Sequence, residues 1–358
     1  MNITEIKLFR YSLPLKFPVR LAKTTLEVRE GLIIQLANEY ELLGFGEIAP
    51  FPGFSRESLG DAESQVLDIL SRHPDSIDSR ELENKLKGFY PSVQFGIESA
   101  LLDLRAKERS VKISQFLSRS PLKSVSVNGL LTGSREDILR KAREYSEKSY
   151  KAVKLKVGSN SLDTDIEITK EVRGIIGEYT LLRLDANRAW TVEKAREFCD
   201  SVGECDIDYV EEPVLDSLIL RQELNNKSLS VPIALDETTR EISPDELAGF
   251  KNVKAVVLKP MLLGVSRTLK FAREAHDLGI TPVIGSSFES GLGLSILANL
   301  AAAVNFDDIP AGLDTYSWYK EDIIPGSLPV RKGRINISEL PAFETVLKSP
   351  VLKESVAP

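Results

Sequence analysis

The chain has 358 residues, and its 46 basic and 53 acidic residues give a net charge of −7. This length predicts two domains or one barrel with an appended domain, and the mild acidity without a basic block argues against a nucleic-acid or anionic-membrane partner. No stretch has the apolar run of a signal peptide or of a membrane span, so we expect a cytoplasmic protein. Cys199 and Cys205 have neither redox nor zinc-site spacing, and we expect them to be buried thiols.

Residues 1–122 have the pattern of a small α+β domain. Between the first two predicted strands, residues 16–31 predict a loop with Arg20, Lys23 and Arg29. Charge alone fits a solvated surface loop as well as it fits a binding loop. The alternation of apolar and polar residues predicts strands at 3–13, 31–37 and 42–48 and helices at 58–70 and 92–107.

Residues 123–324 change to a regular alternation of strands and helices with a period of about two dozen residues. The first strand is predicted at 124–131, and about eight strands follow one another up to 310–314. Repeated right-handed crossovers close into a barrel, in which the chemistry lies at the C-terminal ends of the strands. A doubly wound open sheet is the alternative, but no Gly-rich phosphate turn follows the first strand. Residues 325–358 contain a predicted strand pair, which we expect to return to the first domain because a closed barrel has no free edge.

Three acidic residues end three successive predicted strands: Asp185, Glu211 and Asp236. Such hard oxygen donors suit Mg²⁺, and without a cation three converging carboxylates would repel one another. Asn187 lies two residues after Asp185 on the same strand face and is expected to orient these ligands. Glu211 and Glu212 are neighbours, and only one of them can face the barrel mouth. A single acid would suggest a helix cap or an ion pair, whereas three in phase favour a metal site.

Three lysines accompany these acids at strand ends. Lys154 and Lys156 are two residues apart and face one way, and Lys259 approaches from across the barrel. Adjacent ammonium groups lower the pKa of at least one lysine, which allows it to act as a general base. Two lysines beside a carboxylate-bound metal suit proton abstraction next to a carboxylate. Since the chain has only two histidines, we expect these lysines to carry the acid and base chemistry.

The motifs KLK, DAN, EEP, DE and KP, in this order and spacing, resemble the enolase superfamily and in particular its muconate-lactonising branch. The resemblance covers nearly the whole chain. It implies a (β/α)7β modified TIM barrel under an N-terminal α+β capping domain, with Asp185, Glu211 and Asp236 as the ligands of Mg²⁺. The first glutamate of EEP matches the position of the family's ligand, which favours Glu211 over Glu212.

Within that branch, REGLIIQL, GFGEIAPFPGFSRES, LRLDANRAWT, GSSFESGLGL and IPAGLDT are similar to the o-succinylbenzoate synthase family of menaquinone biosynthesis. The resemblance implies dehydration of 2-succinyl-6-hydroxy-2,4-cyclohexadiene-1-carboxylate to 2-succinylbenzoate. Lys156 would remove the ring proton and then protonate the departing hydroxyl on the same face. Lys259 would stabilise the enolate from the other face, and Lys154 would help to bind the carboxylate.

This small substrate carries two carboxylates, which gives the basic loop with Arg20 and Lys23 a purpose. The succinyl carboxylate is expected at the turn of Ser286 and Ser287 and the backbone near Gly312, because amide N–H groups of the last barrel loops form anion sites.

Three other functions remain open. An N-acylamino acid racemase would use Lys156 and Lys259 as two opposed bases with the same metal. A dipeptide epimerase is disfavoured, because GLDTYSW offers only Asp314 where those enzymes carry Asp-x-Asp. A non-catalytic barrel that binds a ligand or partner is disfavoured by the intact set of lysines and acids. Nothing in the sequence indicates the oligomeric state.

Overall fold

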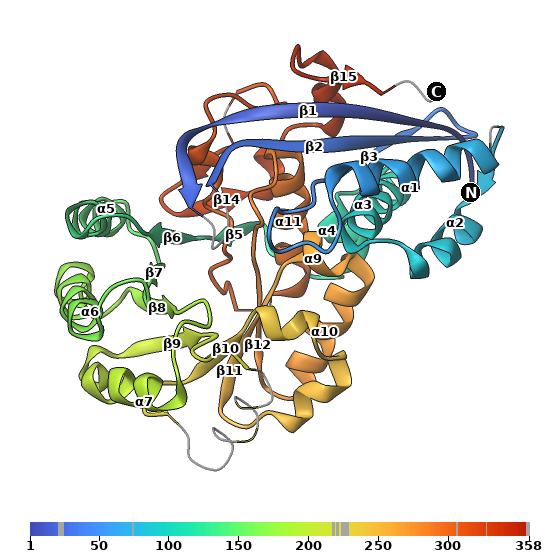
Figure 1. Cartoon of the computed structure of the whole chain (residues 1–358). Helices are drawn as coiled ribbons and strands as arrows, with labels where there is room; N and C mark the ends of the chain where they lie inside the picture. Colours follow the sequence, from blue (N-terminus) through green and yellow to red (C-terminus); the bar gives the residue numbers. More distant parts are fainter. Residues whose placement is uncertain are drawn as a thin grey trace.

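Two sheets organise the computed structural model: a five-stranded N-terminal sheet and a seven-stranded parallel sheet (Figure 1). Among the described helices, none has both the length and the apolar character needed to cross a membrane. The structure describes residues 1–20, 25–73, 75–216, 219, 222, 229–305, 307–326 and 328–355.

The N-terminal sheet has two buried faces. Leu32 and Ile34 pack in the cluster formed with the helices of this domain, whereas Ile33 between them packs in the cluster of the barrel. Side chains alternate across a strand, so the continuous apolar run LIIQL is what a sheet covered on both sides requires. The strands are β1 (Asn2–Arg20), β2 (Thr25–Asn38), β3 (Leu43–Ile48), β4 (Ile77–Asp78) and β15 (Lys353–Glu354), and the helices are α1 (Leu59–Arg72), α2 (Ser79–Lys85), α3 (Pro91–Glu108) and α4 (Ile113–Leu117).

The prediction of a loop at residues 16–31 is wrong for most of that range. Strand β1 continues to Arg20 and β2 begins at Thr25, and these two residues pair across an antiparallel hairpin. Leu26 is buried between exposed neighbours, as in a strand with one buried face. The charged residues at the exposed positions made this alternation difficult to recognise in the sequence. Lys23 lies outside the described residues.

Seven parallel strands follow one another in chain order around the barrel. The ring closes at residues 311–312, because Val127 bridges Ala311 and Gly285 bridges Gly312. This arrangement agrees with the predicted (β/α)7β barrel. The strands are β6 (Asn128–Leu131), β7 (Ala152–Lys156), β8 (Leu181–Asp185), β9 (Ile207–Glu211), β10 (Ile233–Leu235), β11 (Val253–Leu258) and β12 (Thr281–Ile284).

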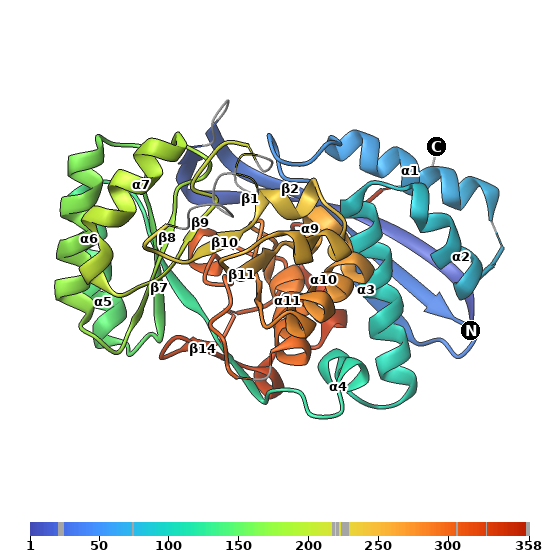
Figure 2. The ribbon, with the colours of Figure 1, turned by 90° about the horizontal axis from the view of Figure 1, so that it is seen from below.

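The barrel helices stand on two sides of the strands. Figure 2 shows α5, α6 and α7 along one side, with α10 and α11 on the other side next to α3. Between β10 and β11, short 3₁₀ segments replace the expected helix, and Pro244 begins the second of them. The bounds are α5 (Arg135–Glu147), α6 (Leu162–Ile176), α7 (Val192–Ser201), η3 (Glu237–Arg240), η4 (Pro244–Gly249), α9 (Pro260–Leu263), α10 (Val265–Asp277) and α11 (Gly291–Val304).

The strand predicted at 124–131 is two strands. Strand β5 (Ser124–Ser126) pairs antiparallel with β14 (Arg334–Asn336), and only β6 enters the barrel. The strand pair predicted after residue 325 is present as β13 (Val330–Arg331) and β14. It lies beside β5, and the part of the C-terminal segment that joins the N-terminal sheet is β15, which pairs with β1. The domain boundaries after residues 122 and 324 stay a prediction.

Both cysteines are buried free thiols, as predicted.

Candidate active site

Charged side chains gather at the carboxyl ends of five neighbouring barrel strands. The parallel register aligns Lys156 of β7 with Asp185 of β8, and Asp185 with Glu211 of β9. Parallel strands end at the same edge of a barrel, so residues far apart in the sequence meet there. The gathered side chains are Lys154, Lys156, Asp185, Glu211, Asp236 and Lys259.

The three acids are almost completely buried. Asp185 and Glu211 are each 1% exposed, and Asp236 is 2% exposed. Buried carboxylates need counter-charges, because an unpaired ion loses its hydration. Lys154 Nζ lies 2.9 Å from Asp185 Oδ2 and 3.2 Å from Glu211 Oε1, and Lys259 forms an ion pair with Asp236.

Lys156 is the most accessible of the three lysines. Its side chain is 34% exposed, compared with 16% for Lys154 and 18% for Lys259. Its Nζ donates to Asp185 Oδ2 at 2.7 Å and to Asn187 Oδ1 at 2.6 Å. The Asn187 N–H donates to Asp185 Oδ1 at 3.1 Å. Asn187 therefore contacts both the acid and the lysine, although β8 ends at Asp185 and Asn187 itself has a positive φ of 44° rather than strand geometry.

Of the two adjacent lysines, Lys154 does not have the lowered pKa that was expected for at least one of them. Burial lowers the pKa of Lys154, but Asp185 and Glu211 outweigh burial and raise it. Burial lowers the pKa of Lys259 too, but the charges of Asp236 and Glu237 together outweigh burial and raise it. The prediction considered the neighbouring ammonium groups and omitted the carboxylates that separate them.

The pKa values of the three acids shift in different directions. Burial raises the pKa of Glu211, and the charge of Asp185 adds to this effect. Burial opposes ionisation of Asp185 and Asp236 as well, but neighbouring lysines outweigh it and lower the pKa of both.

Glu212 is the functional candidate that the sequence left undefined. Its carboxylate accepts hydrogen bonds from the N–H groups of Asp236 and Thr238, both at 2.8 Å, and from Arg188 Nε at 3.0 Å. Glu212 therefore fixes the loop that carries Asp236, while Glu211 faces Lys154. The two adjacent glutamates in the sequence were the signal that one would face the site and the other would point elsewhere. Arg188 was not predicted.

The donor set fits a hard divalent cation in kind. Carboxylate oxygens are the ligands that Mg²⁺ prefers, and three buried ones come from adjacent strands. The lysine ammonium groups contact the oxygens that a cation would take. As the side chains stand, no three His, Cys, Asp or Glu residues within the described ranges are grouped closely enough to hold a metal ion.

The backbone donors predicted for the succinyl carboxylate already have partners. The Ser286 N–H donates to the Gly312 carbonyl at 2.9 Å, and the Gly312 N–H donates to the Ile284 carbonyl at 2.8 Å. The Ser287 N–H donates to Glu289 at 2.7 Å. The buried Ser287 hydroxyl has no hydrogen-bond partner in the described part of the chain. Carboxylate binding at this turn therefore stays a prediction.

Arg29 connects the two domains. It is 1% exposed, and its guanidinium donates to the carbonyls of Pro50 at 2.8 Å and Phe288 at 2.9 Å. Arg29 is thus neither a solvated residue nor free for substrate. The backbone of Arg20 belongs to β1, but its side chain lies outside the described atoms, so substrate binding by Arg20 stays a prediction.

A segment of the N-terminal domain covers the mouth of the barrel. The ring of Phe54, in the segment 51–57, lies with its centroid 5.9 Å from Lys259 Nζ. We call residues 51–57 the cap loop. The sequence did not indicate the contact of Phe54 with the lysine.

Comparisons with known proteins agree with this geometry. The Enolase C-terminal domain-like family matches residues 137–341, and the family MenC, N-terminal domain matches residues 3–104. The o-succinylbenzoate synthase of Aliivibrio fischeri is 35% identical over 326 residues, which cover 88% of this chain and 91% of that protein. The chain belongs to the o-succinylbenzoate synthase family of the enolase superfamily. The family resemblance predicted from the sequence is confirmed.

Two solved structures share the fold of this o-succinylbenzoate synthase family member. The N-succinyl Arg/Lys racemase from Bacillus cereus has a TM-score of 0.84 at 22% identity, over 99% of this chain and 100% of that one. The L-Ala-D/L-Glu epimerase from Bacillus subtilis has a TM-score of 0.83 at 24% identity, over 94% of this chain and 96% of that one. These likenesses confirm the predicted barrel and N-terminal α+β domain.

Proposed function

We propose that the protein is an o-succinylbenzoate synthase, which dehydrates 2-succinyl-6-hydroxy-2,4-cyclohexadiene-1-carboxylate to 2-succinylbenzoate in menaquinone biosynthesis. The observation that carries the proposal is the pair Lys156 and Lys259 beside three buried carboxylates. It occurs in a chain that is 35% identical over 88% of its length to a protein of that name.

Lys156 is the proposed acid and base. Its Nζ takes the proton from the ring carbon that bears the carboxylate, and it returns that proton to the hydroxyl group that leaves from the same face. The C–H and C–O bonds break, a ring double bond forms, and water departs. Lys156 suits this role because it is more exposed than Lys154 and Lys259, which are held by buried acids.

Lys259 and Lys154 are assigned supporting roles. Lys259 extends from the end of β11, on the other side of the cluster from β7, and its ammonium would stabilise negative charge on the far face of the ring. Lys154 would help to bind the ring carboxylate while remaining paired with Asp185 and Glu211.

Asp185, Glu211 and Asp236 would hold Mg²⁺, with Asn187 orienting Asp185. The ion would supply positive charge next to the substrate carboxylate. The chain itself keeps these carboxylates in place through Glu212, which binds the N–H group of Asp236, and through the lysine ion pairs. The substrate is a small dicarboxylate, and Ser286, Ser287, Gly312 and Arg20 remain its proposed contacts.

An N-acylamino acid racemase is the second candidate, because Lys156 and Lys259 extend from strands on different sides of the cluster and could act as opposed bases. A dipeptide epimerase is less well supported. The carboxylate of Asp314 accepts a hydrogen bond from the Tyr150 hydroxyl at 2.9 Å, so it is already engaged.

The test is a spectroscopic assay with the cyclohexadiene carboxylate and Mg²⁺, run beside a polarimetric assay with N-succinyl amino acids. We expect rapid formation of the aromatic product that a chelator stops and added Mg²⁺ restores. Racemisation without aromatisation would replace the proposal with the racemase. A folded protein that does neither would support the non-catalytic barrel.

A further inference from the structure

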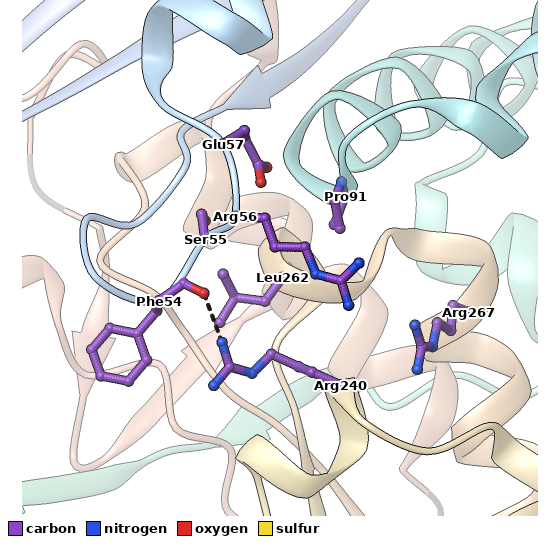
Figure 3. Close-up of a pocket in the computed structure, with 8 residues that line it drawn as sticks. All are labelled: Phe54, Ser55, Arg56, Glu57, Pro91, Arg240, Leu262 and Arg267. Carbon is purple, nitrogen blue, oxygen red and sulfur yellow. Dashed lines mark hydrogen bonds between the residues drawn. The ribbon is translucent and has the colours of Figure 1, made fainter.

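A polar pocket lies beside the cap loop (Figure 3). It offers about 90 Å³, which is room for several water molecules or one small anion. The cap loop and the start of α3 contribute one side, and the barrel rim contributes the other. The lining residues are Phe54, Ser55, Arg56, Glu57, Pro91, Arg240, Leu262 and Arg267.

Three arginines from separate elements line this pocket. Arg56 belongs to the cap loop, Arg240 ends η3, and Arg267 lies in the first turn of α10. Glu57 is the only acid in the lining, so the formal charge is +2 in a protein whose net charge is −7. Burial lowers the pKa of Arg267 and the charge of Arg56 lowers it further, which shows that the like charges repel one another.

The arginines have hydrogen-bond donors to spare. Arg240 Nη1 donates to the Phe54 carbonyl at 2.7 Å, while its buried Nε has no partner among the described residues. Arg267 uses one nitrogen, Nη2, for the carbonyls of Thr239 and Ile242 at 3.0 and 2.7 Å. A guanidinium carries five N–H groups, so each of these two side chains keeps several for a ligand.

The other two charged residues of the pocket, Arg56 and Glu57, differ in their hydrogen bonds. Within the described chain, Arg56 is exposed and has no hydrogen bond or ion pair. Glu57 is buried, and its Oε1 accepts hydrogen bonds from the hydroxyl of Ser92 at 2.5 Å and from its N–H at 3.2 Å. Glu57 Oε2 has no partner among the described residues. The acid therefore neutralises none of the arginines by a direct contact.

We propose that this pocket binds a doubly charged oxyanion, which joins the cap loop to the barrel rim. Guanidinium groups bind carboxylates and phosphates through paired N–H donors, and a charge of −2 balances the lining. The inference is independent of the proposed function. The two sources of such an anion are a phosphate group and a dicarboxylate.

The anion would fix the loop that touches the active site. The Phe54 ring centroid lies 5.9 Å from Lys259 Nζ and 5.8 Å from Arg240 Cζ, so one ring separates the pocket from the lysine. An anion held between Arg56 and Arg240 would keep Phe54 over Lys259.

The test is calorimetric titration of the full chain with inorganic phosphate and, separately, with succinate, at an ionic strength held constant with NaCl. We expect a saturable site that depends on Arg56. Arg56→Gln should weaken binding by at least about tenfold, because it removes charge-assisted hydrogen bonds. This variant leaves no described partner unsatisfied, so its thermal unfolding should match that of the wild type.

Arg273→Gln is the matched control, because Arg273 is an exposed arginine of α10 outside the pocket, and it should keep wild-type affinity. Saturable binding of phosphate, succinate or both that Arg56→Gln weakens supports the site and identifies the source. The proposal is overturned if neither anion binds, or if Arg56→Gln binds as tightly as the wild type. The second result is also what phosphate bound to the active-site lysines would give.

Discussion

Lys154 and Lys156 lie two residues apart on one strand, yet their surroundings differ. Lys154 is held between Asp185 and Glu211, with 16% of its side chain exposed. Lys156 shares Asp185 but turns its other side to Asn187, and it is 34% exposed. The first lysine is thus part of a buried ion cluster, whereas the second can reach a bound molecule.

Replacing these lysines should separate stability from turnover. Lys156→Ala is expected to lower turnover at least about a hundredfold with little change in stability, because a positioned acid or base contributes that much.

Lys154→Ala should lower the free energy of unfolding of the metal-free protein by about 3 kcal/mol, since it leaves two buried carboxylates without their shared cation. Product formation and urea unfolding measure the two effects, with the exposed Lys170→Ala as control. Full turnover in Lys156→Ala would sink its assigned role.

The sequence predicts the residues of the cluster because their position at strand ends follows from the repeat itself. The partners of those residues depend on packing between segments that the repeat does not relate. Arg29 reaches carbonyls about 20 and about 260 residues away, so its burial had no local signal. The raised pKa of Lys154 likewise depends on distances to acids on other strands.

At the scale of elements, a strand of the N-terminal sheet caps a barrel helix. Glu47 of β3 accepts hydrogen bonds from the N–H groups of Ser290 at 2.9 Å and Gly293 at 2.8 Å, at the start of α11. It also accepts the hydroxyl of Tyr11 at 2.5 Å. A helix N-terminus leaves N–H groups unpaired and favours negative charge. A Cβ at Gly293 would lie 2.4 Å from Glu47 Oε2, which explains the glycine.

Removing this cap should destabilise the whole chain. Glu47→Ala leaves the buried donors of Tyr11, Ser290 and Gly293 without an acceptor, and we expect a loss of about 3 kcal/mol in the free energy of unfolding. Urea unfolding measures it. Glu27→Ala, at an exposed position of β2, should change stability by less than about 0.5 kcal/mol. Equal stability of the two variants would show that the cap is not needed.

The helices predicted at 58–70 and 92–107 are present as α1 and α3, with ends that differ by no more than two residues. The long β1–β2 hairpin was missed because charged residues occupy its exposed positions. The split between β5 and β6 could not be foreseen, because both strands lie in one apolar run and only pairing with β14 separates them.

At the scale of the whole molecule, buried and half-buried acids lie where the N-terminal sheet meets the barrel. Burial raises the pKa of Glu289 to about 7, and the charge of Glu47 adds to this while Arg29 opposes it. Burial also raises the pKa of Asp322 to about 7. The hydrogen bond from the Gly291 N–H opposes this rise, because it favours the charged form. The order of segments around the barrel was predictable from the repeat. This junction was not, because its acids come from β3, the β12–α11 loop and the chain after the barrel.

These acids make the junction sensitive to pH. The ordinary glutamate pKa is 4.5 and that of folded Glu289 is about 7, so between these values the folded chain keeps a proton that the unfolded chain has lost. The free energy of unfolding therefore falls by about 3 kcal/mol as the pH rises through this window. Above the window, Glu289 no longer makes it depend on pH. Glu289→Gln mimics the protonated form, so its stability should fall less between pH 5 and pH 8 than that of the wild type. Urea unfolding at several pH values tests this, with the exposed Glu321→Gln expected to keep the wild-type slope. Identical slopes in the wild type and Glu289→Gln would mean that Glu289 stays charged in the folded protein.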